Sequence, residues 1–330
     1  MVENSRRNIL PLSKFEASKA KLDARLKSDL FLEQESGTIN QPLYHYTSIA
    51  SLRGILTSTS FWFTDYRHLN DPTELVHGVS TAISVAKAIG MTRAGPVTEF
   101  LSLLIDLLRR QNFDSGLLQF FTCSFSSSRD DLKQWQAYGD NGRGIAIGLS
   151  PALFAIEDRI DIAPDERVFV GTVRYQPEAI KKRYAKALHH AVRVVDAAGK
   201  TVWFRGMVQA ARNLFYRNIA NELVASAWIW HSLTSKHDAY EHEKETRLVM
   251  IGSNGMLDPF IKTRMRGKEV VPYIPHRMPL KRNGSLAEII IGPAAPEGAK
   301  QAVEDILAEL GVEGKVAVNR SPIPYRVFVQ

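Results

Sequence analysis

The chain alternates short runs of β-forming residues with stretches whose apolar residues recur at helical spacing, and this alternation constrains its fold most. The strand-like runs include LYHY, FWFT, LLQFFTCSF, RGIAIGL, RVFVGTVRY, ETRLVMI, VVPYIP and AEIIIG. Helical spacing occurs at about 72–86, 96–110, 177–197, 201–232 and 296–311. Short strands interspersed with helices favour an α+β fold, with mixed or mainly antiparallel sheets and flanking helices.

The 330 residues are enough for one large domain or two modest ones. Residues 1–40 are polar and charged, and we expect them to form a helical appendage over ASKAKLDARLKSDLFLEQ. No internal repeat and no low-complexity linker interrupts the remainder. We therefore expect a single α+β domain over 41–330, with a helical segment at about 177–232 inserted or packed alongside.

Composition restricts the class of protein. The net charge of +7 permits an anionic partner but is spread over a large surface, which favours a mildly basic enzyme over a dedicated nucleic-acid-binding protein. The single cysteine, Cys123, excludes a disulfide within the chain, and we expect a buried, unreactive thiol there. No apolar run is as long as a membrane span, and the N-terminus lacks the apolar centre of a signal peptide. We expect a cytoplasmic protein with no membrane partner.

Familiar catalytic motifs are missing from the sequence. There is no GxxxxGK[ST] loop, no HExxH, no GxGxxG after a strand and no complete nucleophile elbow. His231, His237 and His242 lie near two glutamates, but their spacing matches no metal site, and a solvated helix end explains them better. We expect no metal.

The stretch YRHLNDPTELVHG, at 66–78, combines a helix start with unexplained polar residues. Asp71 suits the N-cap, Pro72 the first helical position, and Glu74 the position that reaches back to the cap. Helix initiation does not require His68 or Asn70. Since they precede the helix in a strand-to-helix loop, we expect Asn70 to face a ligand or to brace the loop.

Two further clusters carry polar or aromatic side chains at strand ends. The first is His45, Tyr46 and Thr47. The second is SFSSSRDDLKQWQAYGDNGRGIAIG, at 124–148, where glycines would let the backbone approach a ligand; its candidate residues are Ser124, Ser126, Trp135 and Tyr138. A hydrogen-bonded core histidine is an equally good interpretation of His45. Both aromatic residues of the second cluster can instead belong to the core.

The third cluster is Glu243-x-Glu245-x-Arg247. At strand spacing the three side chains share one face, which would place two carboxylates beside a guanidinium. A solvated ladder on an edge strand is the alternative. The apolar LVMI that follows favours a central, buried strand, where like charges are costly unless they have a task.

In this order, the clusters resemble a microbial family known as a domain of unknown function, number 2971. The matching pieces are LYHYTS, LNDPTE, CSFS, W-x-x-Y-G with GIAIG, E-x-E-x-R-L-V, EIIIGP and SPIPYR, over about 43–328. The resemblance implies no activity.

A weaker resemblance is to ADP-ribosyltransferases, in a strand-borne His-Tyr-Thr, a strand ending in Ser-x-Ser, and a late strand with Glu-x-Glu. It implies a split-sandwich fold with a ligand cleft, and NAD as substrate. It places His45 on the nicotinamide ribose or amide, Ser124, Ser126 and Tyr138 around the nicotinamide, and Glu245 on the ribose.

The residues suit this chemistry. A fixed carboxylate stabilises the oxocarbenium-like state formed when the nicotinamide glycosidic bond breaks. We expect Glu245 to be this group, with Glu243 as its helper or as the group that activates the acceptor, and with Arg247 holding Glu245 or a diphosphate oxygen. We also expect Glu245→Gln to leave folding nearly intact.

The acceptor would be a protein or a nucleic acid, possible settings are phage defence and a toxin, and the oligomeric state is open. The competing hypothesis is a non-catalytic sensor module that binds a nucleotide or nucleic acid. The basic stretch 262–282, with seven Lys or Arg and one acid, suggests a nucleic-acid partner, although a solvated loop explains it equally well.

Overall fold

The structure, a computed structural model, describes residues 39–71, 74–110, 118–154, 168–253, 255–312 and 316–327, together with 16, 17 and 20. The chain divides into two compact units. The first combines Met1–Glu33, Asp71–Phe113 and Arg174–Asp238, and the second combines Gln34–Asn70, Asp114–Val173 and Ala239–Gln330. This differs from the single domain expected over 41–330. The expected appendage at 1–40 lies almost entirely outside the described residues.

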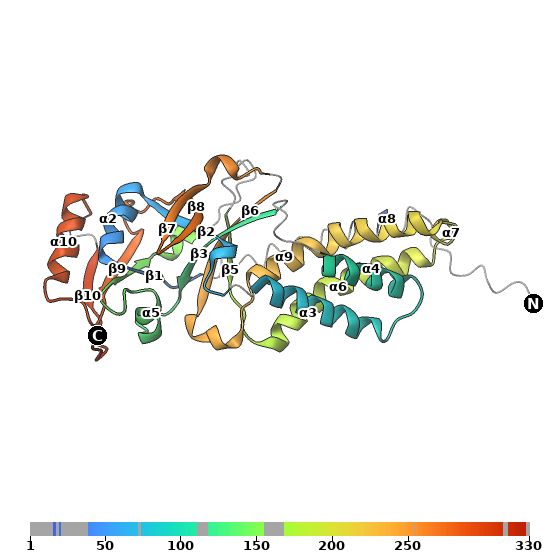
Figure 1. Cartoon of the computed structure of the whole chain (residues 1–330), viewed down its shortest axis with the longest axis horizontal. Helices are drawn as coiled ribbons and strands as arrows, with labels where there is room; N and C mark the ends of the chain where they lie inside the picture. Colours follow the sequence, from blue (N-terminus) through green and yellow to red (C-terminus); the bar gives the residue numbers. More distant parts are fainter. Residues whose placement is uncertain are drawn as a thin grey trace, which may run out of the picture. The chain divides into compact units, whose positions relative to one another are not determined.

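The first unit is helical. It contains α3 (Glu74–Gly90), α4 (Pro96–Arg110), α6 (Pro177–Gly199), α7 (Val202–Arg205), α8 (Gln209–Ala220), a π-helical turn (Asn221–Ala225) and α9 (Ser226–Leu233) (Figure 1). These helices bury a core of their own, which includes Phe100, Leu104, Tyr184, Leu188, Val195, Tyr216 and Trp228. Because α3 and α4 pack with the helices of 177–233, the unit is built from two distant segments and is larger than the helical segment expected. The predicted helix at 72–86 is confirmed from Glu74 onward, whereas Pro72, and with it the capping geometry, falls outside the described residues.

The second unit is an open, mixed and mostly antiparallel sheet with three helices among the described residues, which confirms the α+β class (Figure 1). The strands are β1 (Leu43–Thr47), β2 (Ser60–Asp65), β3 (Leu118–Ser126), β4 (Ile145–Leu149), β5 (Val168–Thr172), β6 (Glu245–Ser253), β7 (Lys262–Arg266), β8 (Glu269–Arg277), β9 (Leu286–Ile291) and β10 (Ala317–Arg320). The helices are α2 (Ile49–Ser58), α5 (Leu132–Ala137) and α10 (Ala299–Glu309). Along the sheet the order is β10-β9-β4-β1-β3-β2-β8-β7, and β6 pairs with both β3 and β5.

The sheet splits along one edge of β3. Strand β1 pairs with β3 through Tyr44 opposite Ser126, while β2 pairs with it through Thr64 opposite Thr122 and Asp65 opposite Phe121. Within the described part of the chain, no strand pairs with this edge between those two points. The halves β1-β4-β9-β10 and β2-β8-β7 therefore diverge from a common strand.

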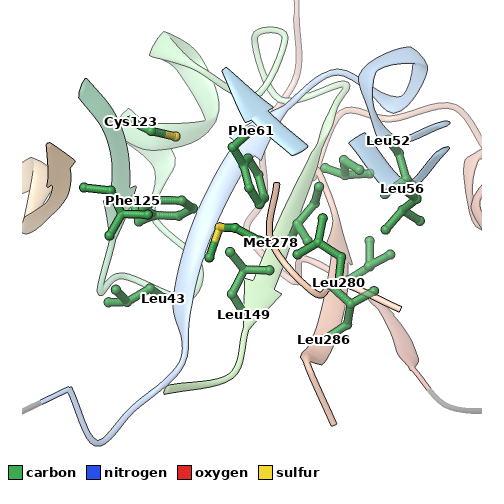
Figure 2. Packing of buried hydrophobic residues seen from close by; sticks show 14 of the residues in the cluster. Leu43, Leu52, Leu56, Phe61, Cys123, Phe125, Leu149, Met278, Leu280 and Leu286 are labelled. Atoms are coloured by element: carbon green, nitrogen blue, oxygen red, sulfur yellow. The ribbon is translucent and has the colours of Figure 1, made fainter. Parts of the chain in front are cut away.

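One face of the sheet carries the main core. Phe61, Phe121, Phe125 and Leu248 lie on this face and pack with Leu52 and Leu56 of α2 and Val303 and Leu307 of α10; Figure 2 shows part of this packing. Alternation along a strand sends every second side chain to the other face. That second face receives Ser124, Ser126, Glu245 and Arg247, whose positions are opposed in the β3–β6 register.

Candidate functional site

A buried carboxylate–guanidinium pair lies on the second face of the sheet. Arg247 donates from Nε to Oε1 of Glu245 at 2.6 Å and from a terminal nitrogen to Oε2 at 3.0 Å. Their exposed fractions are 1% and 5%. Ser124, the cross-strand neighbour of Arg247, also donates its hydroxyl to Oε1 of Glu245. Strand β6 lies between β3 and β5, as its apolar sequence predicted, and its central position fixes the carboxylate in one orientation.

Glu243 does not lie on this strand, and the prediction that it shares a strand face with Glu245 and Arg247 was wrong. It ends a 3₁₀ turn, Asp238–Glu243, and Lys244 has a φ of 44°, so the strand begins only at Glu245. The two-residue spacing therefore does not set the direction of the Glu243 side chain.

Glu243 instead forms a hydrogen-bonded group with Tyr138 and Asn70. The Tyr138 hydroxyl donates to Oε1 of Glu243 at 2.8 Å, and Nδ2 of Asn70 contacts the same oxygen at 3.2 Å and the Tyr138 hydroxyl at 2.6 Å. Asn70 and Tyr138 are both exposed, whereas Glu243 is 5% exposed. Asn70, which helix initiation left unexplained, thus contacts two other candidate residues.

Hydrogen bonds to the backbone oxygen of Glu243 brace the turn that carries this residue. Ser126 donates its hydroxyl to this oxygen at 2.6 Å, and Gln134 approaches it with its side-chain amide at 3.5 Å. The Ser127 amide donates to the carbonyl of Lys244 at 3.0 Å. Ser126 is buried and positions the turn, while the exposed Ser124 contacts a carboxylate.

Tyr138 links the two carboxylates electrostatically. Burial of its hydroxyl, followed by the charge of Glu243 and the hydrogen bond to it, raises the pKa of the phenol, and Glu245 adds to this while Arg247 opposes it. The phenol therefore stays protonated and serves as a donor. Because 39% of the side chain is exposed, Tyr138 is a surface aromatic rather than a core residue.

His45 lies on the opposite face of the sheet, and the prediction that it would line one cleft with Glu245 was wrong. The register places Tyr44 opposite Ser126, so His45 projects into the core side. Its ring centre lies 5.0 Å from that of Phe61 and 5.7 Å from that of Phe125. Burial lowers the pKa of His45 to about 4, so the imidazole is neutral.

His45 has a structural role at the split in the sheet. Its Nδ1 lies 3.4 Å from the backbone oxygen of Ser124, which faces the stretch of β3 where β1 and β2 diverge. A carbonyl oxygen only accepts, so Nδ1 carries the proton in this contact. The histidine supplies a donor where the strand ladder supplies none, which is the core interpretation considered from the sequence.

Tyr46, Thr47 and Trp135 are not brought to the carboxylates. Tyr46 donates its hydroxyl to the backbone oxygen of Ser128 at 2.8 Å, and its ring centre lies 4.7 Å from that of Trp135. Trp135 is fully buried and donates its indole N–H to Asp130 at 2.6 Å. Thr47 is half-buried at the end of β1. Tyr46 and Trp135 belong to a small second core on the same face as the site, whereas Thr47 lies on the other face of β1.

The glycines of 139–144 admit the protein's own chain rather than a ligand. A Cβ at Gly144 would lie 2.1 Å from the Thr47 carbonyl oxygen, and one at Gly142 would lie 2.9 Å from the Tyr325 ring. Gly142 also has a φ of 81°, which favours glycine. Their spacing is thus explained by backbone packing.

Among the described residues, no group of His, Cys, Asp and Glu side chains could hold a metal ion. None of the described helices is long and apolar enough to cross a membrane. Cys123 is buried at 4% exposure, and burial raises the pKa of its thiol.

Fold and site together define an α+β protein with a split sheet, on whose second face Ser124, Tyr138, Glu243, Glu245 and Arg247 meet. Residues 134–248 match the model of a family described as a protein of unknown function, DUF2971. The matched range contains Tyr138 and the segment from Glu243 to Arg247. No curated protein and no solved structure shows a significant match to the chain.

Proposed function

We propose that the chain is an ADP-ribosyltransferase-like enzyme, which cleaves the nicotinamide glycosidic bond of NAD and transfers ADP-ribose to a macromolecule. The observation that carries the proposal is the carboxylate of Glu245, fixed by Arg247 and Ser124 on the face that also presents Tyr138. This contact set supports the role expected for Glu245. His45 is not part of the proposed site.

The chemistry assigns a distinct task to each group. When the bond between the ribose carbon and the nicotinamide nitrogen breaks, its electron pair leaves with nicotinamide and positive charge develops on the ribose. A preorganised carboxylate stabilises that charge. Arg247 holds the carboxylate of Glu245 in place through two hydrogen bonds, while the neighbouring Ser124 is exposed. Since Arg247 is 1% exposed and engaged with Glu245, we assign it to orientation rather than to a diphosphate.

Tyr138 and Glu243 serve the second half of the reaction. The exposed ring of Tyr138 offers a flat surface to a nicotinamide, and its hydroxyl connects to Glu243. An acceptor O–H or N–H that forms a bond to the ribose carbon must release a proton, and Glu243 takes it directly or through the Tyr138 hydroxyl. The proposal extends to the biological setting. A cytoplasmic enzyme of this kind would act in phage defence by modifying a macromolecule of the host or of the phage, or it would act as a toxin.

A second candidate is a non-catalytic sensor module that binds a nucleotide or nucleic acid on the same face. The observation that favours it is that both oxygens of Glu245 accept from Arg247, as in a structural ion pair. This module would bind its ligand without turnover.

The test is release of nicotinamide from NAD, followed by chromatography, by wild-type protein, Glu245→Gln and Glu243→Gln. Glu304→Gln on α10, where the glutamate side chain is 41% exposed, is the matched control. The transferase proposal expects Glu245→Gln to lose roughly two to three orders of magnitude in rate. It expects Glu243→Gln to impair transfer to an acceptor more than hydrolysis of NAD. Wild-type protein that binds NAD without releasing nicotinamide supports the sensor module instead.

A further inference from the structure

The ribbon formed by β2, β8 and β7 carries cations and aromatic rings on a single face. Lys262, Arg264 and Arg266 alternate along β7, and the register places Lys262 opposite Tyr273 and Arg264 opposite Val271. In β2, Trp62 and Thr64 lie opposite Pro275 and Tyr273. All these side chains therefore share one face with Arg277, and we name it the basic aromatic face; its members are Trp62, Lys262, Arg264, Arg266, Tyr273 and Arg277.

The charges of this face are mostly uncompensated. Glu269 neutralises Arg266 at 2.8 Å. Within the described part of the chain, no acidic side chain pairs with Lys262, Arg264 or Arg277. Lys262 and Arg277 are exposed, and Arg264 is half-buried. A partly desolvated guanidinium without a carboxylate is a ready partner for an anion.

Arg264 lies beside a pair of stacked aromatic rings. Its guanidinium carbon lies 5.1 Å from the centre of the Trp62 ring and 5.9 Å from that of Tyr273, and the two rings are 4.4 Å apart. One terminal nitrogen donates to the Thr64 hydroxyl at 3.2 Å, which leaves most of the five N–H donors for a ligand. Trp62 is 45% exposed despite its size. An exposed ring beside an unpaired guanidinium suits a base and its phosphate.

We infer that the basic aromatic face binds single-stranded nucleic acid. Stacked bases and a cationic groove that follows the phosphates are the general means of recognising such strands. Three unpaired cations spread over two strands suit several phosphates rather than the one or two of a free nucleotide, and an acidic peptide would not use the exposed Trp62 ring. A duplex hides its bases from such a ring.

The same face leads to the carboxylate site. Thr64, which contacts Arg264, lies opposite Thr122, and Thr122 precedes Ser124 by two residues on the same side of β3. Two residues of strand span about 7 Å. Resting on the proposed function, a strand bound on this face is the acceptor of ADP-ribose; the binding itself does not depend on turnover.

Binding is tested by fluorescence anisotropy with labelled single strands of RNA and DNA of about 12 nucleotides, without NAD and over a range of salt. Arg264→Gln should weaken binding by about tenfold and reduce the salt slope by roughly one phosphate contact. Trp62→Ala should weaken it by about 5- to 150-fold, as expected for one lost stacked base. If Arg264→Gln is unstable, Arg277→Gln, at an exposed position, tests instead whether loss of one cation reduces the dependence of affinity on salt. Lys300→Gln on α10 is the matched control and should bind as the wild-type protein does.

Equal affinity of wild-type protein and all three face variants would overturn the inference. Equal competition by duplex DNA, heparin or polyglutamate would overturn it too, because the face would then be a general anion surface. Failure of the proposed function gives a different result. A protein that binds the strand but never releases nicotinamide would support nucleic-acid binding by the basic aromatic face and refute the transferase activity.

Discussion

Replacing Glu245 by glutamine should lower the free energy of unfolding as well as the rate of nicotinamide release. Arg247 is 1% exposed and donates to both carboxylate oxygens at 2.6 and 3.0 Å. Glutamine keeps one acceptor oxygen, replaces the other with a donor and removes the charge. The sequence alone suggested that folding would be nearly intact in this variant, and the burial of Arg247 reverses that expectation.

The magnitude follows from the geometry. Breaking a buried ion pair by removing one partner costs about 3–5 kcal/mol, and the oxygen that glutamine retains favours the lower end, about 3 kcal/mol. For a domain of this size each kcal/mol corresponds to about 2–4 °C in Tm, so Tm should fall by roughly 6–12 °C.

The assay is thermal unfolding followed by circular dichroism, with Glu304→Gln as the control for loss of an exposed carboxylate. Arg247→Met and the double variant with Glu245→Gln complete a double-mutant cycle, and the double variant should be more stable than the sum of the single losses. A Glu245→Gln protein that melts within about 2 °C of wild type would show that the pair does not stabilise the fold as reasoned. Nicotinamide release is then compared at a temperature where all variants are folded.

The remaining predictions concern other parts of the sheet unit. Burial lowers the pKa of His45 to about 4 from 6.5, so its contribution to stability is complete above pH 6.5 and is lost as pH falls toward 4; His45→Gln should flatten the decline of Tm over this window and leave nicotinamide release per folded molecule unchanged. Gly144→Ala should cost about 1–3 kcal/mol or more, because its Cβ would lie 2.1 Å from a backbone oxygen, whereas Gly54→Ala in α2, with nothing within 4 Å, should gain roughly 0.5–1 kcal/mol; urea titration measures both. Tyr138→Phe and Asn70→Ala should each slow transfer of ADP-ribose to an acceptor at least about tenfold while lowering Tm less than Glu245→Gln does. Normal transfer in both variants would remove this hydrogen-bonded chain from the mechanism.

Local patterns were sufficient where a residue's environment depends on its own segment. The apolar LVMI predicted that β6 is buried and central, and helical spacing predicted the helices of 74–90, 96–110 and 177–233. The buried thiol of Cys123 followed from the strand around it. In each case the period of the sequence fixes the buried side directly.

Two features of the structure depend on long-range pairing and could not be predicted from the sequence. The face taken by His45 depends on the register between β1 and β3, which are about seventy residues apart, and a shift of one residue would have put it beside Ser124. The separate helical unit arises because two distant segments of the chain bury their apolar faces against each other. Neither fact is written in a local pattern.

Glu243 shows why a motif and its geometry have to be separated. Its spacing from Glu245 suggested a shared strand, yet the chain adopts a φ of 44° at Lys244, a conformation that costs an L-residue about 1–2 kcal/mol. Hydrogen bonds from Ser126 and Ser127 to the two carbonyls of this bend hold it in place. A regular strand would have sent Glu243 along the sheet, whereas the bend brings its carboxylate to the hydroxyl of Tyr138. The fold thus accepts local strain to place a second carboxylate beside an exposed aromatic ring, which is typical of a site shaped for a ligand rather than of a surface ladder.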